Sequence, residues 1–189
     1  MPFDVNTFRA NLLNDGARPT LFEVILTFPP AIITPGLVGL TEAVAFKARA
    51  TSLPGDSISS IPVNYFGREI KVQGNRSFPD WSITVINDED FLIRNSFERW
   101  MSLMNSHATN IKTFLGPEYQ TDATVLQYGK NSEVIKSYTF YGLFPTDVSA
   151  IDLDWGSTDQ IEEFAVTFAY QYWESNSTIA ADVNAAGIL

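Results

Sequence analysis

The segment from Ile161 to Glu174, IEEFAVTFAYQYWE, alternates with a period of two residues. One set of positions is apolar or aromatic, and it comprises Phe164, Val166, Phe168, Tyr170 and Tyr172. The other set is small or polar, and it comprises Glu163, Ala165, Thr167, Ala169 and Gln171. Because successive side chains of a strand point to opposite faces, the pattern predicts a long β-strand with one buried and one hydrated face. A smooth hydrated face suits the wall of a barrel or channel better than a catalytic pocket.

The bulk composition is compatible with one compact domain. The chain has 189 residues, of which 45% are hydrophobic, so it can bury a sizeable core. It contains no cysteine, which excludes disulfides, thiolate nucleophiles and cysteine-based zinc sites. Its first residues lack the basic start and apolar run of a signal peptide, and no stretch approaches the roughly 20 apolar residues of a membrane span. We therefore expect a soluble protein made in a cytoplasm, without membrane insertion.

Charge is unevenly distributed along the chain. The net charge of −10 argues against general nucleic-acid binding, which needs a basic surface. No Lys or Arg follows Lys136, whereas acidic residues such as Asp152 and Asp154 continue beyond it. A group of basic residues lies mid-chain: Lys47, Arg49, Arg68, Lys71 and Arg76. Either the acidic end is simply solvated, or the basic region of one molecule meets the acidic region of the next and so generates rings or filaments.

Several further strands and one helix are expected. The strands are predicted at 21–28, 44–49, 81–86, 124–128, 134–144 and, more briefly, at 151–155. The segment 61–72 is predicted to be extended with a bend or bulge at Gly67, and Gly74-Asn75 is predicted to be a turn. The helix is predicted over 88–106. The chain is therefore expected to be mainly β, a β-sandwich or partial barrel with one packed α-helix.

The predicted helix has a well-defined apolar stripe. Ile93, Phe97, Trp100 and Met104 recur at helical spacing. Acidic residues precede them, at the positive end of the helix dipole. Arg94 and Glu98, four residues apart, are expected to pair on the outer face.

The residues predict no catalytic, cofactor or metal site. The single histidine, His107, lies near the predicted helix end, where an imidazole interacts favourably with the helix dipole. Asp152, Asp154 and Asp159 lack the regular spacing and closing glutamate of a Ca²⁺ loop. The four tryptophans fall on apolar phases and are expected to anchor the core rather than to line a sugar site.

Three blocks carry a resemblance to a known family. They are Ala17–Val24, Phe46–Asp90 and Tyr141–Glu174, and they include the runs PVNYFGREIKV, RSFPDW and LDWGSTDQIEEFAV. The chain thereby resembles the tail tube proteins of contractile-tailed, T-even-like bacteriophages. The resemblance implies a non-enzymatic virion protein without cofactors, assembled in the host bacterial cytoplasm. It also implies six-subunit rings whose inner strands join into a large β-barrel, with the rings stacked into a hollow tube.

The resemblance implies partners as well. These are other copies of the chain, the tail sheath protein, and baseplate and tail-terminator proteins, with DNA passing transiently through the lumen. Within that assembly we expect Glu163, Thr167 and Gln171 to face the lumen, where negative charge repels phosphate. We expect the extended 54–76 region to reach a neighbouring subunit or ring.

The contacts of that extended region are predicted from charge. Arg68, Lys71 and Arg76 are expected to meet acidic partners on the neighbour, such as Asp152 and Asp154.

The predicted organisation is a single domain over 1–174, including an N-terminal segment over 1–16, followed by a C-terminal tail over 175–189. An insertion-like 29–42 segment and that tail depart from the family pattern. Two related readings stay open: a tube-initiating baseplate protein, and the tube of a phage-derived or type VI-like injection particle. A carbohydrate-binding β-sandwich is the alternative from another class.

Overall fold

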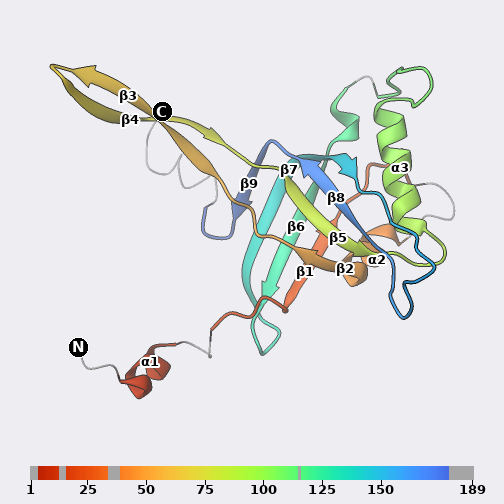
Figure 1. Ribbon diagram of the computed structural model, residues 1–189, viewed down its shortest axis with the longest axis horizontal. Coiled ribbons are helices and arrows are strands. Elements are labelled where there is room, and N and C mark those ends of the chain that lie inside the picture. Colours follow the sequence, from red (N-terminus) through yellow and green to blue (C-terminus); the bar gives the residue numbers. More distant parts are fainter. Residues whose placement is uncertain (1–3, 13–15, 34–38, 115, 179–189) are drawn as a thin grey trace.

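The computed structural model describes residues 4–12, 16–33, 39–114 and 116–178. Over these residues the protein is mainly β, with antiparallel pairing throughout its sheets (Figure 1). The strands are β1 (Phe22–Leu26), β2 (Ala48–Thr51), β3 (Ser57–Tyr65), β4 (Arg68–Ser77), β5 (Trp81–Ile86), β6 (Thr121–Tyr128), β7 (Val134–Val148), β8 (Glu163–Ala169) and β9 (Tyr172–Ser175). The helices are α1 (Val5–Asn11), α2 (Leu40–Lys47) and α3 (Leu92–Met104), with a short 3₁₀ turn at Pro117–Tyr119. The mainly β fold class predicted from the sequence is confirmed.

A seven-stranded sheet forms the body, in the order β1-β6-β7-β8-β5-β2 with β9 also paired to β7. The long strand β7 belongs to two halves of this sheet, because its first part pairs with β6 and β9 and its last part, 144–148, pairs with β8. Gly142 lies at the change of partner with a φ of +64°. We call β2, β5, β8 and residues 144–148 of β7 the four-stranded wall.

The core lies between the sheet and α3. Trp81 stacks on Phe140 with ring centroids 4.4 Å apart, and Phe97 of α3 meets Phe168 edge-on at 5.8 Å. The Trp100 indole N–H donates to the Tyr119 carbonyl at 2.9 Å, which ties α3 to the 3₁₀ turn. The Trp81 indole N–H likewise donates to the Ser52 carbonyl at 2.9 Å, so both fully buried tryptophans combine a large apolar contact with a satisfied polar atom.

The helix predicted over 88–106 is present but shorter. Its apolar stripe is buried at Ile93, Phe97 and Trp100, as predicted. The helix starts later because the Asp90 carboxylate accepts the Leu92 N–H at 3.0 Å and Phe91 adopts a left-handed conformation. The Arg94–Glu98 pair is confirmed at 2.9 Å.

The strand predicted over 44–49 is wrong for most of its length. Residues 40–47 form α2, and only Ala48 and Arg49 fall in β2. Leu40 and Val44 lie one helical turn apart and are both buried, so the helical period prevails over a short alternation that fits either structure. Phe46, placed by the strand pattern on the same face as Val44, is exposed instead.

The turn predicted at Gly74-Asn75 is also wrong, because both residues lie within β4. The register of β3 and β4 shifts between Ile58 and Ser60, so an extra residue of β4 opposes Ser59 as a β-bulge. A Cβ on Gly74 would lie 2.3 Å from the Ser59 hydroxyl, which explains the glycine by close approach rather than by chain reversal. The reversal occurs at Phe66-Gly67, where the sequence indicated a bend or bulge.

The short strand predicted at 151–155 is absent, since the described chain from 149 to 162 forms a loop. The Asp154 carboxylate accepts the Gly156 N–H at 3.0 Å, and this local turn competes with strand formation. The prediction that all four tryptophans anchor the core is wrong for Trp155. Trp81 and Trp100 are fully buried, whereas Trp155 is fully exposed.

The long final strand is present but interrupted. Phe164, Val166 and Phe168 of β8 are buried, as the alternation predicted. The ladder breaks at Tyr170-Gln171, and β9 resumes beside an earlier part of β7, which leaves Tyr172 exposed. The break lies opposite the bend at Gly142, so the bend in β7 ends the alternation.

Three sequence predictions lie partly outside the described residues. One is the N-terminal segment 1–16, of which 1–3 and 13–15 are not described. The others are the tail 175–189, beyond residue 178, and the 29–42 segment, between 33 and 39. No helix among the described residues combines the length and apolarity needed to span a membrane.

Candidate assembly surfaces

The face of the four-stranded wall that points away from the core is small and polar. Ser82 of β5 pairs with Thr167 of β8, which in turn pairs with Asp147 of β7. Thr84 and Ala165 form the next pair along the wall. Their neighbours in sequence, such as Ile83 and Val166, are buried, so the alternation places these five on the outer face.

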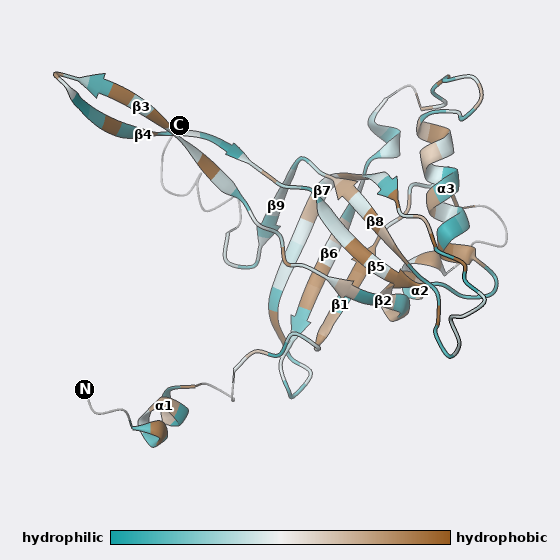
Figure 2. Ribbon diagram, viewed as in Figure 1, coloured by the Kyte–Doolittle hydropathy of each residue, from teal (hydrophilic) through white to brown (hydrophobic). Residues whose placement is uncertain are grey.

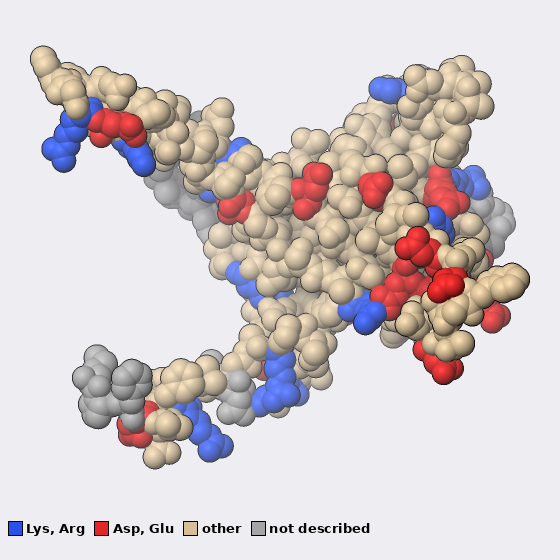
Figure 3. Space-filling model, viewed as in Figure 1, with Lys and Arg blue, Asp and Glu red and all other residues tan. Residues whose placement is uncertain are grey.

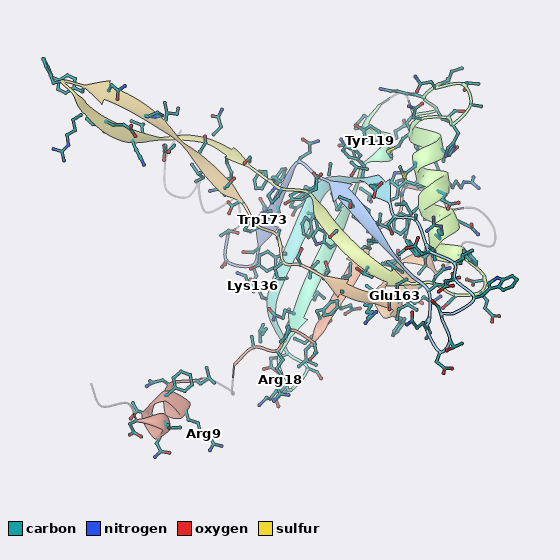
Figure 4. All side chains as sticks on the ribbon, in the orientation of Figure 1. Arg9, Arg18, Tyr119, Lys136, Glu163 and Trp173 are labelled. Carbon is teal, nitrogen blue, oxygen red and sulfur yellow. The ribbon has the colours of Figure 1, made fainter. Side chains whose placement is uncertain are left out.

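The three residues predicted to face a lumen have different positions. Glu163 and Thr167 share the polar face of the wall, whereas Gln171 is exposed in the break between β8 and β9. Glu163 of β8 (labelled in Figure 4) forms an ion pair with Arg49 of β2, across the intervening strand β5. Ser82, Thr84 and Asp147 share the polar face and were not predicted from the sequence, although alternation in Trp81–Ile86 indicates the first two.

The wall has two open edges. Among the described strands, β2 pairs only with β5, and residues 144–148 of β7 pair only with β8. The unpaired backbone groups of such edges are templates for pairing with another chain. The wall therefore carries one available edge on each side.

The strands β3 and β4 form a hairpin that projects from the body (Figure 1). Its register pairs Ile61 with Val72 and Val63 with Ile70, so these four share one face, and each is exposed. Figure 2 shows apolar and polar segments alternating along both strands. A lone two-stranded hairpin is marginally stable in water, and an exposed apolar face of this kind marks a binding surface.

The predicted basic contact residues do not form one cluster. Arg68 pairs with Tyr65 beside the tip, and Lys71 pairs with Pro62 on the opposite face of the hairpin. Arg76 lies at the base and forms an ion pair with Asp56 at 2.8 Å. Arg76 therefore already has an acidic partner in its own chain.

The predicted acidic residues lie on the loop 149–162, which joins β7 to β8. This loop lines a groove of about 900 Å³ that contains Asp152, Asp154, Leu153 and Trp155. Leu153 is 83% exposed and Trp155 fully exposed. Figure 3 shows acidic atoms gathered at this end of the molecule, and basic atoms with acidic atoms between them on the hairpin at the other end. The two charged regions cannot meet within one chain.

Three tyrosines have a raised pKa. For Tyr141 the largest cause is burial, followed by the Glu174 charge. Burial raises the pKa of Tyr170, and Asp80 and Asp56 add to the effect. The Tyr170 hydroxyl is buried without a hydrogen-bond partner among the described residues. A hydrogen bond to Glu23 raises the pKa of Tyr128, with smaller effects from desolvation and the Glu23 charge. None of the three belongs to the polar face of the wall, so they bear on stability rather than on assembly chemistry.

A family model and curated relatives of the chain point to the same family. The family model described as "Phage tail tube protein" matches residues 17–176. Tail tube protein gp19 of Enterobacteria phage T4 is 36% identical over 167 residues, which cover 88% of this chain and 96% of that protein.

Solved structures share the fold at low sequence identity. A chain in the anti-feeding prophage baseplate aligns with a TM-score of 0.63 at 14% identity, covering 84% of this chain and 94% of that one. A chain in the PVC sheath-tube complex of an extracellular contractile injection system aligns with a TM-score of 0.54 at 14% identity, covering 92% and 97%. At these identities the likeness concerns the fold.

Proposed function

The chain belongs to the phage tail tube protein family, and we propose that its copies join edge to edge into rings whose walls form one continuous β-barrel. It is a structural tail tube protein of a contractile-tailed phage. The observation that carries the ring proposal is the four-stranded wall, which has an open edge on each side and a small polar face.

Ring closure uses those two edges. The β2 edge of one copy pairs with the 144–148 edge of the next, and a closed ring leaves neither edge exposed. The contact is heterologous, so each copy uses its β2 edge toward one neighbour and its 144–148 edge toward the other. The ring closes when the repeated rotation between copies adds up to a full turn. Following the family resemblance, the closed ring has six copies.

The polar face of the wall lines the lumen through which DNA passes. Hydroxyl and methyl side chains such as Thr167, Ser82 and Ala165 offer DNA few strong contacts. Asp147 adds negative charge that repels phosphate. Glu163 contributes less charge than the sequence suggested, since Arg49 is paired with it.

Rings stack through a second heterologous contact. The hairpin of one copy reaches the next ring, where Arg68 beside the tip meets acidic residues such as Asp152 and Asp154, and Lys71 adds positive charge from the opposite face of the hairpin. The opposite location of the basic and acidic regions supports this arrangement (Figure 3). Repetition of the contact extends a tube rather than closing a dimer.

The remaining partners follow from the tube role. We propose that the tail sheath surrounds the tube and that baseplate and terminator proteins lie at its two ends. Assembly occurs in the host cytoplasm, before incorporation into the virion. The role requires no enzymatic activity. Binding and self-assembly by the wall and hairpin surfaces suffice for it.

Electron microscopy of the purified chain in negative stain tests the proposal. Long hollow rods are the expected result. Single rings that do not stack would instead favour a tube-initiating baseplate protein. A monodisperse monomer that binds glycans would overturn the proposal in favour of a carbohydrate-binding β-sandwich.

A further inference from the structure

The tip of the β3–β4 hairpin contains a residue that the turn itself disfavours. Tyr65 pairs with Arg68, so the two-residue turn is Phe66-Gly67, with φ values of +45° and +76°. Positive φ at both positions defines a type I′ turn, in which the first position favours Asn, Asp or Gly. A bulky aromatic residue in this conformation is a genuine outlier, and such strain concentrates at functional sites.

Within the single chain, the ring contact that Phe66 makes is with its neighbour Tyr65. The Phe66 side chain is 91% exposed. Its ring meets the Tyr65 ring edge-on at a centroid distance of 4.5 Å, which creates an aromatic pair at the end of the hairpin. An exposed aromatic pair at a strained tip is chemically suited to insertion into a partner's groove.

The loop 149–162 presents a groove of matching chemistry. Its exposed apolar side chains are Leu153, Trp155 and Ile161, and Asp152 and Asp154 line the same groove. The groove is therefore apolar and acidic, whereas the hairpin tip is aromatic with Arg68 beside it. Buried Trp, Tyr and Arg residues are the types that dominate interface energetics.

The sheet places the tip and the groove at opposite ends of the wall. The hairpin leaves the wall between Thr51 of β2 and Trp81 of β5. The loop joins Val148 of β7 to Glu163 of β8, at the end of the wall where Glu163 pairs with Ile86. Copies stacked along the strand direction would therefore bring the hairpin of one ring toward the loop of the next.

We propose that the Tyr65-Phe66 tip of one copy inserts into the groove of a second copy in the adjacent ring, where it packs against Trp155 and Leu153. Arg68 then lies beside Asp152. This inference rests on the proposed stacking of rings and assigns the two surfaces that form the contact. It explains both the strained aromatic turn and the fully exposed tryptophan by one interface.

The variant Phe66→Asn separates binding from folding, because Asn-Gly is the preferred type I′ turn. We expect its thermal midpoint to equal or exceed that of the wild type, while the protein concentration needed for rod formation rises at least about tenfold, the change expected from weakening each contact by about 1.4 kcal/mol. The matched control Phe66→Tyr keeps an aromatic ring and should form rods like the wild type. Normal rod formation by F66N would overturn the inference.

Cross-linking tests the pairing directly, since the chain contains no cysteine. The double variant F66C/W155C should give a ladder of covalent oligomers on mild oxidation, and neither single variant should do so. Covalent dimers from F66C alone would indicate contact between two tips and would overturn the inference. The absence of a ladder from rods of the double variant would do the same.

The variant Trp155→Ala tests whether the groove binds a second copy of this chain or the sheath protein. We expect it to weaken rod formation as strongly as F66N. Normal bare rods that fail to acquire a sheath would assign the groove to the sheath protein and overturn the inference, although the tube function would stand. If the wild-type chain itself forms no rods, the proposed function fails. That outcome differs from rods of the double variant that give no ladder, which contradict only the contact between tip and groove.

Discussion

The Arg49 guanidinium on β2 forms an ion pair with the Glu163 carboxylate on β8, across the intervening strand β5. The pair therefore links three strands of the wall on its polar face. It also places a positive charge where the sequence alone indicated only a negative one.

Removing either partner of this pair should change stability only slightly. Arg49 is 59% exposed and Glu163 29%, and ion pairs near solvent contribute about 0.2–1 kcal/mol. We expect R49A and E163Q each to lower the unfolding free energy of the monomer by less than about 1 kcal/mol. A double-mutant cycle by urea denaturation should give a coupling that shrinks in high salt. A coupling that does not depend on salt would contradict an electrostatic origin.

Gly142→Ala should destabilise the protein by about 1–3 kcal/mol, because the site requires positive φ and lies in a packed bend. A Cβ there would approach the Gln171 side chain to 2.7 Å. Gly116→Ala is the matched control, since nothing lies within 4 Å of its Cβ position and its φ is −137°. Thermal unfolding of both variants measures the difference. Equal midpoints would show that the bend tolerates a side chain.

Tyr170→Phe should stabilise the protein by about 0.5–1 kcal/mol, since it removes a buried hydroxyl that has no partner among the described residues. The folded-state pKa of Tyr170 is raised above 10.0, so its contribution is fully present below pH 10 and is lost as the pH rises through the folded pKa. Y170F should therefore lose less stability than the wild type between about pH 9 and 11. Denaturant midpoints measured across that range check the sign. A steeper alkaline loss in the variant would contradict it.

Elements with a clear period were predictable from the sequence. The strand Trp81–Ile86 and the buried stripe of α3 follow directly from spacings of two and of three to four residues. The 44–49 segment was not predictable in this way, because an alternation of only six residues fits either a strand or a helix. Tertiary packing of Leu40 and Val44 decided it.

The candidate surfaces were predictable only in part. The polar face of β8 followed from alternation, but the ion pair of Arg49 with Glu163 joins residues that are distant in sequence. Trp155 was assigned to the core because alternation cannot report a local turn, here held by Asp154 and Gly156. For the same reason the groove could not be predicted from the sequence. Its composition is visible in the sequence, whereas its exposure depends on where the loop leaves the wall.

Reversing the hairpin charges should prevent stacking. R68E/K71E replaces attraction toward the acidic loop by repulsion, so rods should disappear while rings persist in negative stain. R99E/K112E imposes the same change in net charge at exposed positions outside the hairpin, and we expect it to leave rods intact.

A compensating change tests which charges meet. Adding D152K to R68E/K71E restores an opposite charge on the facing loop, and Asp152 takes no part in the Asp154–Gly156 turn, so this loop should keep its shape. Rods should then reappear in part, more weakly than in the wild type because Asp154 remains acidic. Raising the salt concentration should reduce stacking of the wild type and narrow its difference from the reversed variant, since exposed charges are screened within about 10 Å at 0.1 M salt. Recovery equally strong with D147K, on the wall face rather than the loop, would show that only net charge matters and would rule out a specific contact between the hairpin and the loop.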